Sequence, residues 1–305
     1  MHATGEAPGK IILMGEHAVV YGIPALAVPV GHRMCVDVGW SPGSGMEVDA
    51  PDVDPDDQET RASLERGLSY CVTLLGVRPG RTHFRLTSDI PLGKGMGSSA
   101  ALSVAALRAL AALEDRVVAP PELARLANQV EAIFHGTPSG LDAAVIAHGR
   151  PLLFTRGSPP RTEPLSSGAT LWAVLVDTGA VGNTARLVAG VRALRDAEPA
   201  RVDAIFSQIK KGVIEGIDVL RRGDVAALGP LLSANHHLLR ALGVSTPTLD
   251  KVVQVSLDAG ALGAKLTGAG GGGLALALVA DPSAAAPVIA AIEAMGLRAW
   301  SVALA

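Results

Sequence analysis

The 305-residue chain is long enough for one large domain or for two packed domains, each with its own core. Its formal net charge of −3 and its scattered Lys and Arg residues provide no basic surface for nucleic acid or anionic lipid. The first ten residues lack the pattern of a signal peptide, and the apolar stretch 100–113 is too short to cross a bilayer. Two cysteines without metal-ligand spacing favour a reducing compartment, so we expect a cytoplasmic protein that binds neither nucleic acid nor membranes.

The first half of the chain mixes strand and helix patterns. Short runs of apolar residues bounded by turn residues indicate strands, and apolar residues spaced three and four apart indicate helices. The segment 41–58 is rich in Pro, Gly and Asp, and we expect an exposed loop there. The predicted elements are, in chain order, strands over 8–14 and 25–39, a helix over 60–75, a strand over 83–88, and helices over 98–113 and from 120 to Gly136.

The pattern changes after the Pro-, Ser- and Gly-rich stretch 156–168, and we place a domain boundary there. The order strand, helices, two strands, helix and strand resembles the split βαβ arrangement of ferredoxin-like domains. The predicted elements are a strand over 171–176, helices over 184–196, 201–222, 224–242 and 247–259, strands over 263–267 and 273–280, a helix over 283–295 and a strand over 298–304.

The segment PLGKGMGSSAAL, residues 91–102, has the features of a phosphate-binding loop. Three glycines at alternate positions let backbone N–H groups approach a phosphate chain, and the N-terminus of the following helix offers further donors. Ser98 and Ser99 stand where a hydroxyl can cap the helix, bind phosphate or ligate Mg²⁺. Taken alone, such a short motif is more often a flexible turn with a serine N-cap.

A dinucleotide-binding loop is the competing interpretation of the same residues. Gly95, Gly97 and Ala100 fit the pattern G-x-G-x-x-A, and Asp115 follows Gly95 by twenty residues. That fingerprint requires the acidic residue at the end of a second strand, after the helix is complete. Here the predicted helix runs up to about Asp115, so no room remains for the strand, and a dehydrogenase is disfavoured.

Several charged residues stand beside apolar segments. Lys10 precedes the apolar strand, and Glu16 and His17 follow it. These three residues are either catalytic groups or solvated charges at the ends of the strand. Glu131 borders the apolar stripe of its helix, which is unusual for a carboxylate without a partner or a cation. Asp142 follows Ser-Gly in a loop or at a helix start, where it can be catalytic or a helix N-terminal charge.

Two further segments suggest ligand contacts. The run KLTGAGGGG, residues 265–273, places four successive glycines between two predicted buried strands, which suggests close approach of the backbone to a ligand. The segment NTARLVAGV, residues 183–191, opens a helix, and Thr184 is either its N-cap or a substrate contact.

Taken together, APGKIILMGEHAVVYG (residues 7–22), PLGKGMGSSAAL and KLTGAGGGG resemble the three motifs of the GHMP kinases, in the same order and with similar separation. The resemblance covers the whole chain. It implies an α+β, two-domain GHMP kinase fold, with an N-terminal α/β domain like ribosomal protein S5 domain 2 over 1–165 and a ferredoxin-like C-terminal domain over 166–305. Within the family, GEHAVVYG, EAIFHGTPSGLDAAV and NTARLVAGV are most similar to mevalonate kinases.

The resemblance also implies roles for individual residues. Asp142 matches the general base, with Lys10 beside it stabilising negative charge. Ser99 and Glu131 match ligands of an Mg²⁺ ion that bridges phosphate oxygens of ATP. The remaining residues are implied to bind ATP (Pro91, Gly93, Lys94, Gly95, Met96, Gly97, Ser98, Ser99 and Ala100) or to lie near the substrate (Glu16, His17, Thr184 and Gly270).

The implied reaction is ATP-dependent phosphorylation of the 5-hydroxyl of (R)-mevalonate. Whether the enzyme is a monomer or a homodimer is left open by the sequence. Two residues differ from the family pattern at positions that would lie near ATP or the substrate. Lys94 stands where mevalonate kinases often have Ala, and Gly182 stands where several relatives have a basic residue. Arg186 is then the candidate partner of a substrate carboxylate. The alternatives are a sibling kinase acting on phosphomevalonate, homoserine or another small alcohol, and a non-catalytic nucleotide-binding protein with the same fold.

Overall fold

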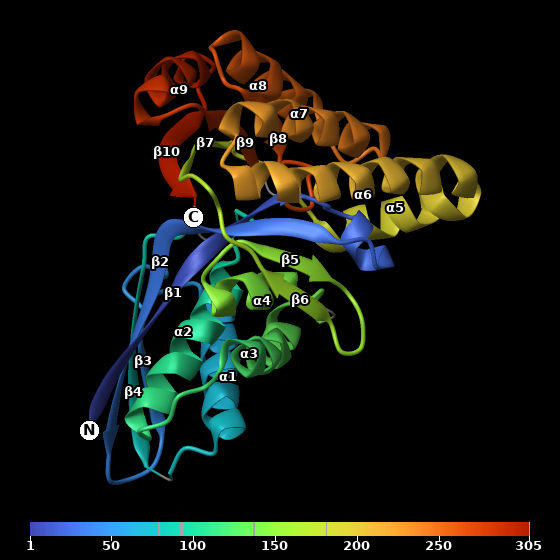
Figure 1. Ribbon diagram of the computed structural model, residues 1–305. Coiled ribbons are helices and arrows are strands. Elements are labelled where there is room, and N and C mark those ends of the chain that lie inside the picture. The colour runs from blue at the N-terminus through green and yellow to red at the C-terminus, as the bar shows by residue number, and fades with distance from the viewer. Residues whose placement is uncertain (79, 92–93, 137, 181, 305) are drawn as a thin grey trace. The chain divides into compact units, whose positions relative to one another are not determined.

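The structure is a computed structural model that describes residues 1–78, 80–91, 94–136, 138–180 and 182–304 (Figure 1). Gly93, one of the predicted ATP contacts, lies outside the described residues. Within the described part of the chain, no helix is both long and apolar enough to cross a membrane.

The chain forms two compact units, and each takes segments that are distant in sequence. The units are not two consecutive halves of the chain, so they do not test a single boundary. The boundary expected after residue 165 therefore stays a prediction. Unit 1 comprises Met1–Lys10, His32–Leu92 and Gly97–Gly149, and unit 2 comprises Ile11–Gly31, Gly93–Met96 and Arg150–Ala305.

The sheet of unit 1 is built from two long strands and two shorter ones. Strands β1 (His2–Met14) and β2 (Ala25–Ser41) pair with each other, and each contributes residues to both units. β2 pairs antiparallel with β4 (Arg81–Ser88), and β3 (Met46–Asp49) runs parallel to β4 on its other side. The expected exposed loop over 41–58 is therefore wrong at β3, a short half-exposed edge strand whose pattern is too brief to stand out from its surroundings.

Four helices complete unit 1, and Figure 1 shows α1, α2 and α3 grouped beside strands β1–β4. The second helix is buried on nearly every side, as its apolar sequence predicts for a central helix. The last one was not predicted as an element: it has eight residues between two left-handed glycines, too few for a helical period to be visible. The bounds are Gln58–Leu75 (α1), Ser98–Leu113 (α2), Pro120–His135 (α3) and Leu141–His148 (α4).

Unit 2 contains a four-stranded antiparallel arrangement in the order β10-β7-β9-β8. Leu175 at its centre lies opposite Trp300 on one side and Leu276 on the other. This order, with helices between β7 and β8 and between β9 and β10, confirms the predicted split βαβ topology. The strands are β7 (Leu171–Asp177), β8 (Gly263–Leu266), β9 (Leu274–Val279) and β10 (Arg298–Leu304).

The helices of unit 2 follow the predicted ones within a few residues. α7 and α8 pack on β8, and α9 packs on β7 and β10. A hairpin within 150–168, formed by β5 and β6, was not predicted, because its strands have only four residues each. The bounds are α5 (Thr184–Ala197), α6 (Pro199–Arg222), α7 (Val225–Ala241), α8 (Pro247–Asp258), α9 (Ala285–Glu293), β5 (Leu152–Thr155) and β6 (Arg161–Pro164), with 3₁₀ turns at Ala18–Tyr21 and Pro282–Ala284.

Candidate active site

Lys10 and Asp142 form an ion pair in unit 1, with 3.1 Å between the Lys10 Nζ and the Asp142 Oδ2. The Lys10 side chain is only 4% exposed, whereas that of Asp142 is 34% exposed, so the carboxylate remains open to a reactant. Asp142 lies in the first turn of α4, where the helix dipole favours negative charge. The structure therefore brings the two predicted catalytic residues together, although they are far apart in sequence.

The turn before α2 needs glycine for two reasons. Gly97 has a φ of 74°, which side chains rarely adopt, and a Cβ there would lie 3.1 Å from Ile146 and 3.2 Å from Lys10. The absence of a side chain thus lets Lys10 approach the N-terminus of α2. Ser98 and Ser99 begin this helix, so the serines follow the left-handed glycine as the phosphate-loop prediction requires.

The Ser99 hydroxyl links two helices of unit 1. It lies 3.1 Å from the Glu131 Oε2 and 3.0 Å from the His135 Nε2. A hydroxyl has one proton, so when Ser99 donates to the carboxylate its oxygen accepts from the imidazole. Glu131 and His135 are four residues apart on α3 and therefore share a face of the helix.

Glu131 is a buried carboxylate that lacks a full set of partners. Burial, and then the nearby Asp142 carboxylate, raise its pKa from 4.5 to about 8, against the Ser99 hydrogen bond and the Lys10 charge. Its Oε1 has no hydrogen-bond partner among the described residues. A buried, unpartnered carboxylate oxygen beside a hydroxyl is the donor set that a hard cation such as Mg²⁺ accepts, so the residues present fit the implied ion.

Within the described residues, no group of three or more His, Cys, Asp and Glu side chains could hold a metal ion without further ligands. Mg²⁺ in phosphoryl-transfer enzymes is usually held by one or two protein ligands together with water and substrate phosphates. Ser99 and Glu131 are compatible with that mode of binding.

Lys94, the lysine that departs from the family pattern, forms an ion pair within unit 2. Its Nζ lies 3.0 Å from the Oδ2 and 3.1 Å from the Oδ1 of Asp177, the last residue of β7. The Oδ1 also accepts a hydrogen bond from the backbone of Gly179. Asp177 thus holds the ammonium group, and the Lys94 side chain is 22% exposed, so an anion can still reach the ammonium.

We expect Lys94→Ala to raise the KM for ATP by ~10-fold, because a hydrogen bond to a charged group contributes ~1.5–3 kcal/mol and Asp177 competes for the ammonium. Asp177→Asn is the matched control: it releases Lys94 and should not raise this KM. The measurement is initial velocity against ATP concentration for the three proteins. An unchanged KM in Lys94→Ala would contradict a phosphate contact.

In unit 2, Glu16 and His17 follow the end of β1 in a tight turn. Glu16 is 1% exposed and pairs with the fully buried Lys265, while Asn235 donates to its Oε2 at 3.0 Å. The His17 Nε2 lies 2.8 Å from the carbonyl oxygen of Ala269. Because a carbonyl only accepts, this nitrogen carries the proton, and burial lowers the pKa of His17 and keeps the ring neutral.

The glycine run in unit 2 lies against other backbone segments. A Cβ on Gly270 would lie 2.1 Å from the Val244 carbonyl oxygen, and a Cβ on Gly182 would lie 2.1 Å from the Gly270 oxygen. Gly182 therefore has a steric reason to be glycine where several relatives have a basic residue. The described neighbours of these glycines are protein backbone, and the expected close approach to a ligand stays a prediction.

Thr184 begins α5 but does not cap it. The side chain of Asn183 is the N-cap, accepting from the backbone of Arg186 at 2.9 Å, so the N-cap interpretation of Thr184 is wrong. Thr184 and Arg186 are both exposed. Their side chains remain available for a ligand.

Besides the polar side chains around Glu16, unit 2 has a second cluster of polar side chains around His236 on α7. Its Nδ1 accepts from the backbone N–H of Leu266, and its Nε2 lies 3.2 Å from Asp250, which also accepts from Ser245 and Arg240. Burial lowers the pKa of His236 from 6.5 to about 4, with Lys265 and His237 adding to the effect and Asp250 opposing it.

Unfolding should therefore depend on pH through His236. At His236 the unfolded chain takes up a proton below pH 6.5, whereas the folded chain takes it up only near pH 4. The free energy of unfolding is therefore highest above pH 6.5 and decreases as the pH falls from 6.5 toward 4. We expect a loss of up to ~3 kcal/mol in the free energy of unfolding, measured with urea at several pH values. His236→Gln should remove this component, and the exposed neighbour variant His237→Gln should retain it. The same slope in both variants would contradict the assignment to His236.

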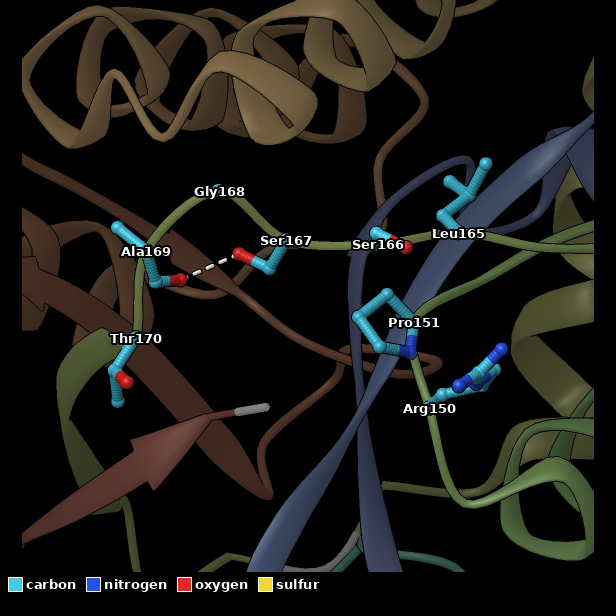
Figure 2. Close-up of a pocket in the computed structure, with 8 residues that line it drawn as sticks. All are labelled: Arg150, Pro151, Leu165, Ser166, Ser167, Gly168, Ala169 and Thr170. Atoms are coloured by element: carbon cyan, nitrogen blue, oxygen red, sulfur yellow. Dashed lines mark hydrogen bonds between the residues drawn. The ribbon is translucent and has the colours of Figure 1, made fainter.

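Unit 2 also has an open pocket of about 450 Å³, lined by Arg150, Pro151 and the turn 165–170 (Figure 2). Its lining includes none of the predicted site residues. The Ser167 hydroxyl within it donates to the carbonyl of Ala169, which fixes the turn internally.

Sequence reasoning assigned no specific role to four residues that contact the predicted ones. His135 could have been found, because it stands four residues after Glu131 on the same predicted helix. Asp177, Asn235 and Lys265 lie far in sequence from Lys94 and Glu16, and only the fold shows these pairs.

Comparison with known proteins points to a single family. Residues 64–150 match the family model described as GHMP kinases N terminal domain, and residues 217–297 match GHMP kinases C terminal. The mevalonate kinase of Thermococcus sibiricus is 34% identical over 97% of this chain and 94% of its own, and that of Archaeoglobus fulgidus is 34% identical over 96% and 98%. Among solved structures, L. major mevalonate kinase in complex with R-mevalonate is 28% identical, with a TM-score of 0.91 over 99% of this chain and 95% of that one.

Proposed function

The chain belongs to the GHMP kinase family, and from that premise we propose that it transfers the γ-phosphoryl group of ATP to the 5-hydroxyl of (R)-mevalonate, giving 5-phosphomevalonate and ADP. The observation that carries the proposal is the cluster of Lys10, Asp142, Ser99 and Glu131 in unit 1. The mevalonate kinases it resembles along nearly its whole length support the substrate.

In the proposed reaction the 5-oxygen forms a bond to the γ-phosphorus as the bond from that phosphorus to the ADP oxygen breaks. Asp142 accepts the hydroxyl proton, and its partially exposed carboxylate is accessible for this. The Lys10 ammonium stabilises negative charge on the phosphoryl oxygens. A loose phosphoryl-transfer transition state depends mostly on positioning and charge neutralisation, so the pair acts mainly through its placement.

Ser99 and Glu131 would hold the Mg²⁺ that accompanies ATP. Bound there, the ion would neutralise charge on the β- and γ-phosphate oxygens. The glycines before α2 and the first backbone N–H groups of that helix would bind the phosphates, and Lys94 would add a charge of its own.

The substrate side of the proposal rests on unit 2. The Nδ1 of His17 is left without a hydrogen-bond partner among the described residues when Nε2 donates to Ala269, so it can accept a bond from a substrate hydroxyl. Thr184 and Gly270 are proposed to lie near the substrate, and the exposed Arg186 is proposed to pair with its carboxylate. Composition supports a cytoplasmic enzyme.

The direct test is incubation of the protein with ATP, Mg²⁺ and (R)-mevalonate, followed by ³¹P NMR. We expect one phosphate monoester for each ADP formed, and none when EDTA removes the metal. ADP formation at the same rate without mevalonate would contradict the proposal, because it would show ATP hydrolysis alone.

A sibling kinase remains the second candidate, because the same catalytic cluster would serve another small alcohol. The observation that favours mevalonate over phosphomevalonate is sequence similarity to the mevalonate kinases over the full chain.

A further inference from the structure

Glu16 is placed near the substrate by family resemblance, and the structure shows it buried between two polar side chains of the protein. The residue is 1% exposed, its Oε1 pairs with the Lys265 ammonium, and its Oε2 accepts from the Asn235 amide at 3.0 Å. Each carboxylate oxygen can accept more than one hydrogen bond, but the 1% exposure of Glu16 leaves little of it accessible to a substrate. Breaking either bond would leave a buried polar partner unpaired, which is costly, so a role within the protein is favoured over a substrate contact.

Lys265 connects this carboxylate to two strands. The residue is fully buried, and besides Glu16 its Nζ donates to the carbonyl oxygens of Ile12 on β1 and Leu266 on β8, at 3.4 and 2.5 Å. These bonds use the three donors of the ammonium group. Thr267, the residue after β8, donates to the same Ile12 carbonyl at 3.1 Å, which is a second hydrogen bond between the ends of β1 and β8.

The residue after Glu16 has a backbone conformation that needs support. His17 has a φ of 59°, which is uncommon for a residue with a side chain and persists only where the surrounding contacts enforce it. Its ring donates to the carbonyl of Ala269, four residues after Lys265. Glu16 therefore anchors the turn before His17, and Lys265 anchors the strand that leads to its hydrogen-bond acceptor.

We propose that Glu16, Lys265 and Asn235 form a buried positioning network that holds His17 in the orientation needed for the substrate, and that Glu16 does not contact the substrate. This inference rests on the proposed function for the identity of the substrate. The orientation of His17 can be tested in the protein without ligand, and that test does not depend on the identity of the substrate.

A double-mutant cycle separates positioning from direct contact. Glu16→Gln should raise the KM for mevalonate by ~10-fold in the native background, because small misplacements of binding groups are costly. In a Lys265→Met background the same change should raise it less than ~3-fold, because the network is already broken. The KM for ATP should change in neither case. An equal rise in both backgrounds, or no rise in either, would overturn the proposal.

The exposed α6 variant Glu215→Gln is the charge-matched control and should leave both KM values unchanged. Since breaking a buried ion pair can prevent folding, Asn235→Ala provides a second route, because it removes one neutral donor and leaves the ion pair intact. This variant should also raise the KM for mevalonate. A folded Asn235→Ala enzyme with the native KM would overturn the role of the network.

Imidazole ¹⁵N NMR of the ligand-free protein gives a readout independent of turnover. The native protein should show His17 as the neutral tautomer protonated at Nε2, and Asn235→Ala should shift this signal, while the exposed His237 signal should not move. An unshifted His17 signal in Asn235→Ala would overturn the proposal. A native protein that shows the expected His17 signal but does not phosphorylate mevalonate would refute the proposed function and leave the positioning supported.

Discussion

Asp142→Asn is expected to lower kcat by ~10²–10⁴-fold, the usual contribution of a general base. The amide keeps the shape of the carboxylate but cannot accept the hydroxyl proton. ATP binding should survive, because the proposed nucleotide contacts lie elsewhere. Steady-state kinetics, nucleotide titration and thermal unfolding of the same preparation measure the three quantities.

Lys10→Met tests whether the two residues act as one unit. Because Lys10 and Asp142 are in contact, the double variant should lose less activity than the product of the two single losses. Asp218→Asn, on an exposed position of α6, is the control and should keep the native kcat. An Asp142→Asn protein that is folded, binds ATP and turns over at a near-native rate would contradict the general-base role.

Glu131→Gln should raise the Mg²⁺ concentration needed for half-maximal rate by at least ~10-fold, since even outer partners of metal ligands contribute ~10–100-fold to affinity. The amide keeps the size and the acceptor oxygen for Ser99 but loses the charge that would hold the cation. The measurement is initial rate against free Mg²⁺ at saturating ATP, and excess Mg²⁺ should partly restore activity.

Glu122→Gln is the matched control for Glu131→Gln, because Glu122 lies on the same helix but is exposed and pairs with Arg125. It should leave the Mg²⁺ titration unchanged. A Glu131→Gln enzyme with the native titration would show that this carboxylate serves only the structure.

The elements that were predicted well are those with many residues in a clear period. The amphipathic and apolar helices appeared within a few residues of their expected bounds, and the order of elements in the second half was enough to predict the ferredoxin-like topology. The missed elements, β3, β5, β6 and α4, have four to eight residues each. So short a segment is specified by the strands and helices it packs on, and its own sequence carries too few positions to show a pattern.

The candidate site divides in a similar way. Lys10, Ser99, Glu131 and Asp142 could be predicted because each stands in a motif, and the structure brings all four together. The partners of Glu16 could not be predicted, because Asn235 and Lys265 are 219 and 249 residues away in the chain. Gly182 shows the reverse case: its departure from the family pattern looked like a lost charge, and the structure adds a steric constraint from the Gly270 carbonyl.

Coupled ADP release across four substrates shows whether this chain is a kinase for mevalonate. The native protein, with saturating ATP and Mg²⁺, would be assayed with mevalonate, phosphomevalonate, homoserine and galactose, each over a full concentration range. We expect by far the highest kcat/KM with mevalonate. Comparable or faster turnover of phosphomevalonate, homoserine or galactose would contradict it, while leaving the kinase fold and its catalytic cluster in place.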